Sequence, residues 1–261
     1  MSGYDPEKAA AALHQARKAR ERLAPLPANV APRTVAEGAA AQHALFRRGG
    51  AARPGGFKIG ATAQRMQEYL GLSGPAAGFM ATGDVHPSGV TLRFADYVHP
   101  GVECELAVRL AHDLPFGRCT QAQAAEAAGE LIAAIELVEN RYGDLAELGT
   151  PTLIADQVFH AAAVVGAAGT TDWRKLDLEK LPGRIVVDAH VRDQGVGADL
   201  MGHPLNSLAW LAGSAVAEAF GGLKAGQVIM LGSVTPPVWL TGPATVTVEF
   251  APLPPVQLRL A

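Results

Sequence analysis

The sequence predicts an α+β fold in which helices pack around a mixed, mostly antiparallel β-roll core. Two observations predict it. Residues 1–75 are rich in Ala and in helix-capping residues, whereas from Gly78 onward short β-rich runs are separated by Pro and Gly. These runs are unevenly spaced, which favours a rolled sheet with helices outside it. We therefore expect a small helical N-terminal lobe over residues 1–75 and a larger domain over residues 76–261.

Several of the expected helices carry start or stop signals. Thr34-Val-Ala-Glu37 has the spacing of a capping box, in which a hydroxyl and a carboxylate satisfy backbone N–H groups at a helix start. Glycines mark the C-terminal ends of three expected helices, at Gly49-Gly50, Gly71 and Gly221-Gly222. The expected helices cover residues 5–23, 34–49, 62–71, 120–129 and 205–220.

The expected strands are short runs with high β propensity. The run over residues 185–192 is followed by Asp193-Gln194-Gly195, which predicts that it forms one arm of a hairpin with its turn at these three residues. The expected strands cover residues 90–94, 102–110, 132–139, 185–192, 228–231 and 244–250.

Charge and composition exclude several classes of function. The formal net charge of -3 gives no reason to expect a nucleic-acid partner. Basic residues do gather near the start, but their place in an Ala-rich helix indicates a solvated helix face. These residues are Arg17, Lys18, Arg20 and Arg22.

Cysteine usage and hydropathy indicate a cytoplasmic protein. Cys104 and Cys119 are the two cysteines, and no CxxC or Cys/His spacing suggests zinc or a disulfide framework. The N-terminus lacks the apolar core of a signal peptide. No apolar run approaches the roughly 20 residues that span a bilayer, so we expect no membrane contact.

Three glutamates form the main chemical signal. Glu103 and Glu105 alternate along an expected strand, so both side chains point to the same face. Glu136 lies inside an apolar run, where a buried carboxylate needs a partner. One divalent cation would satisfy all three, and an all-carboxylate set suits Mg²⁺, Mn²⁺ or Ca²⁺. The alternative is that Glu103 and Glu105 face solvent while Glu136 pairs with Arg141 or Arg109.

Lys58 is the second signal. It stands between Phe57 and Ile59 in a glycine-flanked segment, where close backbone approach is possible and a lysine seeks an anionic partner. The alternative is a surface lysine whose aliphatic stem covers apolar neighbours.

Five segments carry a resemblance to a known family. They are Lys58-Ile-Gly-Ala-Thr62, Val102-Glu-Cys-Glu-Leu106, Ala134-Ile-Glu-Leu-Val138, Gly202-His-Pro-Leu-Asn-Ser-Leu-Ala-Trp-Leu211 and Leu231-Gly-Ser-Val-Thr-Pro236. In this order they resemble the fumarylacetoacetate hydrolase superfamily. The most similar branch holds the 2-oxopent-4-enoate hydratases, 2-oxohept-3-enedioate hydratases and 4-oxalocrotonate decarboxylases.

The resemblance implies a metal site and a substrate. Glu103, Glu105 and Glu136 would bind Mg²⁺ or Mn²⁺, and Lys58 and the backbone N–H of Leu106 would contact the carboxylate of a small 2-oxo acid. It also implies a β-roll core like that predicted above and a homo-oligomer built from dimers.

The implied activity is a hydratase (lyase) that activates a 2-oxo acid of aromatic catabolism through a metal-stabilised enolate. Two enzymatic alternatives share that enolate: hydrolysis of an acylpyruvate-type C–C bond and decarboxylation of a 2-oxo acid. A further alternative is a non-catalytic binder or partner subunit that keeps the metal site.

The residues that handle protons depart from the family pattern. Thr82 stands where the hydratases carry an Asp, and Asp84, two residues on, is either its catalytic substitute or an ordinary turn residue. In the segment over residues 154–163, Asp156 matches the family, and His160 replaces a small polar residue. His160 is therefore either a proton-transfer group or a buried core histidine.

Four further residues are expected at the substrate pocket. Gln157 and Phe159 belong to the same segment, and the Phe159 ring would narrow or reshape the pocket. Ser233 and Thr235 lie in a Pro-rich loop, where their hydroxyls either line the pocket or bond their own backbone.

Overall fold

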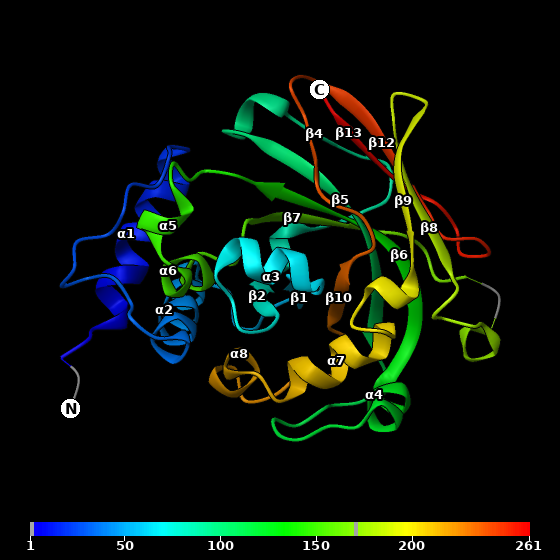
Figure 1. Cartoon of the computed structure of the whole chain (residues 1–261), viewed down its shortest axis with the longest axis horizontal. Helices are drawn as coiled ribbons and strands as arrows, with labels where there is room; N and C mark the ends of the chain where they lie inside the picture. Colours follow the sequence, from blue (N-terminus) through cyan, green and yellow to red (C-terminus); the bar gives the residue numbers. More distant parts are fainter. Residues whose placement is uncertain (1–2, 170–171) are drawn as a thin grey trace.

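The computed structural model describes residues 3–169 and 172–261, whose strands form two curled sheets with helices packed outside them (Figure 1). The larger sheet has the order β2-β1-β10-β5-β6-β7-β3, with β11 beside β5, and the smaller one has the order β4-β13-β12-β8-β9. Most of the described pairs are antiparallel, and β1–β10, β3–β7 and β4–β13 are parallel. The predicted mixed, mostly antiparallel β-roll is confirmed. The strands are β1 (Gly56–Gly60), β2 (Ala76–Met80), β3 (Val85–Pro87), β4 (Val90–Leu92), β5 (Pro100–Leu110), β6 (Ala128–Glu139), β7 (His160–Val165), β8 (Pro182–Val187), β9 (His190–Val196), β10 (Val228–Ser233), β11 (Val238–Trp239), β12 (Ala244–Glu249) and β13 (Val256–Leu260).

The helices form two groups around the larger sheet. In Figure 1, α1 and α2 lie beside α5 and α6 at one end of the molecule, and α4 and α7 lie along the other side. No described helix combines the length and the apolar character that crossing a bilayer requires. The α-helices are α1 (Pro6–Ala19), α2 (Val35–Arg48), α3 (Gln64–Leu70), α4 (Gln121–Ala127), α5 (Leu145–Leu148), α6 (Thr150–Ala155), α7 (Pro204–Ala212) and α8 (Ala215–Ala219); the short 3₁₀ turns are Thr82–Asp84, Phe94–Asp96, Trp173–Lys175 and Gly197–Asp199.

The helix caps agree with the sequence. The Thr34 hydroxyl accepts a hydrogen bond from the Glu37 backbone N–H at 3.1 Å, so α2 begins where the capping motif predicts. Asp5 caps α1 in the same way through the N–H of Glu7. Residues 56–60, however, form β1 of the larger sheet, so the segment before residue 75 is not helical throughout. The division of the chain at residue 75 stays a prediction.

Two predicted elements are corrected by the structure. The run over residues 185–192 is split between β8 and β9, because the hairpin turns at Asp188 and Ala189, both with positive φ, and not at residues 193–195. Ala is unusual in a left-handed turn position, so the sequence hid this turn. The predicted helix over residues 205–220 is two helices, because Ser214 caps a new start at α8.

The central strands β5 and β6 form the middle of the core. They pair along almost their whole length, and both are buried except at a few positions. The edge strand β2 of the same sheet comes close to the segment before β7. A Cβ added at Gly78 would lie 2.9 Å from the carbonyl oxygen of Gln157. Gly78 therefore permits the sheet to curl back on itself.

Candidate metal centre and substrate cavity

Three carboxylates converge on one face of the two central strands. Glu103 of β5 is directly opposite Glu136 of β6, and Glu105 follows two residues after Glu103 on the same face. One oxygen from each of the three lies within 4.8 Å of the others. Glu105 and Glu136 are buried, with 1% and 0% of their surfaces exposed. The predicted alternation along β5 places Glu103 and Glu105 on one face, and the pairing of β5 with β6 adds Glu136.

The carboxylates strongly disfavour one another's charge. Burial and the charge of Glu136 raise the pKa of Glu103 to about 8. Burial, followed by the charges of Glu136 and Glu103, holds the pKa of Glu105 well above its usual value. Burial acts in the same direction on Glu136, but Lys58 and His160 outweigh it and lower the pKa of Glu136. Negative charge is thus concentrated on Glu136, and a further cation is required before all three can ionise.

Lys58 and His160 both contact a single oxygen of Glu136. Lys58 Nζ lies 3.3 Å from Glu136 Oε1, and His160 Nδ1 lies 2.8 Å from the same atom. The other oxygen, Oε2, is buried and has no hydrogen-bond partner among the described residues. Arg141 and Arg109, which the sequence offered as partners of Glu136, bind Asp156 and Glu130 instead.

This donor set fits a hard divalent cation. The three side chains offer only carboxylate oxygens, which are the ligands that Mg²⁺ and Mn²⁺ prefer. A buried carboxylate oxygen without a partner is costly, and Glu136 Oε2 is such an atom within the cluster. A cation beside Glu103, Glu105 and Glu136 would satisfy Oε2 and relieve the mutual repulsion.

A cavity of ≈ 470 Å³ adjoins the carboxylates. Lys58 and Glu103 contribute its charged groups, and Phe159 and Trp239 contribute aromatic walls. A smaller cavity of ≈ 140 Å³ shares Glu103 with the larger one and is also lined by Thr62 and the loop after β10. The larger volume lies within the roughly 300–1,000 Å³ typical of small-molecule sites.

The two hydroxyls after β10 have different surroundings. Ser233 Oγ accepts a hydrogen bond from the Cys104 backbone N–H at 3.0 Å and donates to the Thr235 carbonyl at 2.7 Å, so it holds the loop in place. Thr235 Oγ1 is buried and has no hydrogen-bond partner in the part of the chain that the structure describes, and Thr235 lines the smaller cavity with Ser233. Leu106 lies in β5 where the pairing with β10 is irregular, and it lines neither cavity. The predicted contact between its backbone N–H and the substrate therefore stays a prediction.

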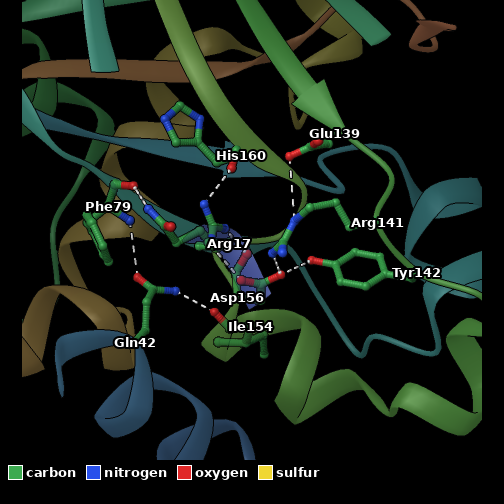
Figure 2. A network of polar contacts seen from close by, with 10 residues as sticks. Arg17, Gln42, Phe79, Glu139, Arg141, Tyr142, Ile154, Asp156 and His160 are labelled. Carbon is green, nitrogen blue, oxygen red and sulfur yellow. Dashed lines mark hydrogen bonds and ion pairs between the residues drawn. The ribbon is translucent and has the colours of Figure 1, made fainter. Parts of the chain in front are cut away.

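Asp156 lies behind the site in a buried ionic network (Figure 2). Its Oδ1 accepts from Arg17 Nε at 2.6 Å, and its Oδ2 accepts from Arg141 and from the Tyr142 hydroxyl. Arg17 was interpreted as part of a solvated helix face, and the structure corrects this: it reaches from α1 to Asp156 and to the His160 carbonyl oxygen. These contacts occupy both carboxylate oxygens of Asp156, so its side chain orients the residues around it.

The segment that joins α6 to β7 has an unusual backbone. Gln157, Val158 and Phe159 have φ values of 62°, 52° and 66°, a left-handed conformation that costs energy for residues other than glycine. Gln157 Nε2 donates to the Phe79 carbonyl at 2.7 Å, which fixes the segment to β2. The turn directs the Val158 carbonyl to Lys58 Nζ at 2.5 Å. Gln157 thus supports the site and does not line the larger cavity.

The structure separates the two predicted proton-handling residues. His160 is buried beside Glu136, and its Nε2 has no partner among the described residues. Asp84 lies at the 3₁₀ turn before β3. Its charge contributes, after burial, Glu139 and Asp96, to raising the pKa of the Tyr97 phenol. Asp84 lines neither cavity.

Sequence reasoning missed most of the cavity wall. Trp239 of β11 and Val138 of β6 belong to elements whose inward faces become apparent only from strand pairing. Met66 and Leu70 share one face of α3, a spacing that could have revealed a lining helix.

Comparisons with known proteins agree with this architecture. Residues 61–261 match the family model described as fumarylacetoacetate (FAA) hydrolase C-terminal. A 2-keto-4-pentenoate hydratase of Paraburkholderia phymatum is 31% identical over 96% of this chain and 95% of its own.

Solved structures give the same fold. A 4-oxalocrotonate decarboxylase from Pseudomonas putida G7, complexed with magnesium and adipate, superposes with a TM-score of 0.88 at 24% identity, covering 98% of this chain and 97% of that one. A fumarylpyruvate hydrolase from Pseudomonas aeruginosa, in complex with Mn²⁺ and pyruvate, has a TM-score of 0.61 at 15% identity, covering 78% and 88%.

Proposed function

Because the chain belongs to the fumarylacetoacetate hydrolase family, we propose that it is a divalent-metal-dependent hydratase of short unsaturated 2-oxo acids. The observation that carries the proposal is the convergence of Glu103, Glu105 and Glu136 beside a substrate-sized cavity. The curated relative that aligns over 96% of the chain is named for the hydration of 2-keto-4-pentenoate. Hydration of an acid of this class is therefore the assigned reaction.

Glu103, Glu105 and Glu136 are the residues that hold Mg²⁺ or Mn²⁺ in this proposal. When bound, the ion supplies Lewis-acid polarisation of the 2-oxo carbonyl. Two structures of the same fold were solved with magnesium and with Mn²⁺, which supports the choice of metal.

Lys58 binds the carboxylate end of the substrate. Its ammonium group lies inside the cavity, 3.3 Å from Glu136, so it holds positive charge next to the metal ligands. A Cβ added at Gly60 would lie 3.2 Å from Lys58 Nζ, so a glycine at this position keeps the space around the ammonium group open. The Leu106 backbone N–H and the unpartnered Thr235 hydroxyl complete the polar groups proposed to orient the substrate.

His160 positions Glu136. Its hydrogen bond to Oε1 fixes the carboxylate and leaves Oε2, which has no partner among the described residues, available to a cation. Asp156 in turn holds Arg17, which binds the His160 carbonyl oxygen and so steadies the start of β7.

The proposed reaction adds water across the C4=C5 bond of 2-oxopent-4-enoate, with the hydroxyl joining C4 and a proton joining C5. A single product, 4-hydroxy-2-oxopentanoate, is expected from the full chain with Mg²⁺, and mass spectrometry identifies it. Release of carbon dioxide or of two carboxylic fragments from a panel of 2-oxo acids would instead assign decarboxylation or C–C hydrolysis. No turnover and no enolisation of any acid would indicate a binding subunit.

Cytoplasmic location and homo-oligomeric assembly belong to the same proposal. Both cysteines are free thiols in the structure, which suits a reducing compartment. Light scattering on the purified chain tests the assembly, and a mass equal to one chain would remove the oligomer from the account.

A further inference from the structure

The larger cavity has a charged end and an apolar remainder. Lys58 and Glu103 supply its ionisable groups, and Asn140 supplies a neutral amide. Elsewhere the described lining is hydrocarbon or aromatic, with Leu145 and Trp239 among the larger side chains. A ligand that places its 2-oxo carboxylate beside Lys58 must therefore place its other end against an apolar wall.

Among the side chains that the structure describes, three cations near this wall have acidic partners. Lys58 is paired with Glu136. Arg17 and Arg141 bind the segment that carries Phe159, but Asp156 contacts both of them. Arg141 also has Glu139 as a partner at 3.5 Å. The charges of Arg17 and Arg141 are balanced by those of Asp156 and Glu139, and none of these four residues lines the cavity.

From these observations we propose that the substrate is a 2-oxo monocarboxylate whose tail is apolar and uncharged. The inference rests on the proposed function, because it takes the Lys58 end of the cavity as the place of the 2-oxo carboxylate. A second carboxylate at the far end of the chain would lose its hydration against Leu145, Trp239 and their neighbours without gaining a cation from the described lining. The cavity therefore selects against dicarboxylic 2-oxo acids of the same length.

The direct test compares two acids that differ only at the tail. 2-Oxohexanoate ends in a methyl group, and 2-oxoadipate ends in a carboxylate. Both are saturated, so neither can be hydrated, and binding to the full chain with Mg²⁺ is measured by titration calorimetry. We expect 2-oxohexanoate to bind at least about 10-fold more tightly. Equal binding, or tighter binding of 2-oxoadipate, would overturn the inference.

Oxalate separates this inference from the proposed function. Its two adjacent carboxylates imitate the carboxylate and 2-oxo group of a 2-oxo acid, and it has no tail. Mg²⁺-dependent binding of oxalate with no preference for 2-oxohexanoate would remove only the inference about the tail. Failure of oxalate and of both 2-oxo acids to bind with Mg²⁺ would instead reject the proposed function.

A variant of the wall provides a second test. Leu145 is partly buried at the start of α5 and lines the cavity. Leu145→Lys introduces a cation there, and Leu145→Gln is the neutral polar control. We expect Leu145→Lys to improve 2-oxoadipate binding about 10-fold relative to Leu145→Gln, with oxalate binding equal in the two. No difference between the variants, with both still folded by thermal melting, would contradict the placement of the tail at this wall.

Discussion

Glu103 and Glu136 face each other directly across the ladder between β5 and β6, with both carboxylates on the inner face of the sheet. Like charges in directly opposed positions destabilise a sheet. In this chain a third carboxylate, Glu105, lies beside the pair. Such an arrangement stores repulsion that a bound cation relieves, and this relationship leads to the predictions below.

Mg²⁺ should stabilise the protein more at high pH than at low pH. The pKa of Glu103 is raised from 4.5 to about 8 in the metal-free fold, so the fold binds a proton that the unfolded chain releases. The metal-free protein therefore loses stability as pH rises from about 4.5 to about 8. Thermal melts at about pH 6 and about pH 9, with Mg²⁺ or with a chelator, measure the difference. An equal gain in Tm from Mg²⁺ at both pH values would contradict the link between the protonation of Glu103 and stabilisation by the metal.

His160→Leu should weaken metal binding without unfolding the protein. It removes the hydrogen bond to Glu136 Oε1, and loss of a group that orients a metal ligand typically costs about 10- to 100-fold in affinity. His160→Asn keeps a donor of shorter reach and should recover part of the loss. Calorimetric titration with Mn²⁺ measures both variants. If the His160→Leu variant binds Mn²⁺ as tightly as the wild type, His160 does not position Glu136.

Lys58→Met should destabilise the fold strongly. It leaves Glu136 buried without its ammonium partner, a change worth on the order of 3–5 kcal/mol for a buried ion pair. Adding Glu136→Gln should restore much of this stability, because the unpaired charge is then gone. Urea unfolding in the presence of a chelator compares the single and double variants. If the double variant is no more stable than Lys58→Met, Lys58 and Glu136 do not stabilise the fold as a pair.

Asp156→Asn should lower stability by about 3 kcal/mol, because Arg17 and Arg141 would lose their shared carboxylate. For a chain of this size, that corresponds to a fall in Tm of roughly 6–12 °C. Asp177→Asn is the matched control, since it breaks an exposed ion pair with Lys180 and should leave Tm unchanged. Equal changes in Tm for the two substitutions would mean that the buried network stabilises the protein no more than an exposed ion pair does.

Local patterns were enough to predict the cluster of three carboxylates and the overall architecture. Alternation along β5 places Glu103 and Glu105 on one face whatever the rest of the fold does. A carboxylate in an apolar run, Glu136, has to find partners wherever it is buried. The capping residue Thr34 fixes a helix start through contacts within four residues.

Features that depend on distant contacts were not predictable in this way. Strand β7 was missed because His160–Val165 is rich in Ala, and only pairing with β6 makes it a strand. Arg17 lies 139 residues from Asp156, so its burial has no local signal. The left-handed turn at Gln157–Phe159 uses no glycine and is held by contacts from α1 and β2.

The most direct test of the central claim is a calorimetric titration of Mn²⁺ into the metal-free chain, with and without oxalate. The account predicts one site per chain, tighter binding when oxalate is present, and loss of binding in Glu103→Gln and Glu136→Gln variants that still fold. Unchanged Mn²⁺ affinity in both variants would show that these carboxylates do not form a metal site.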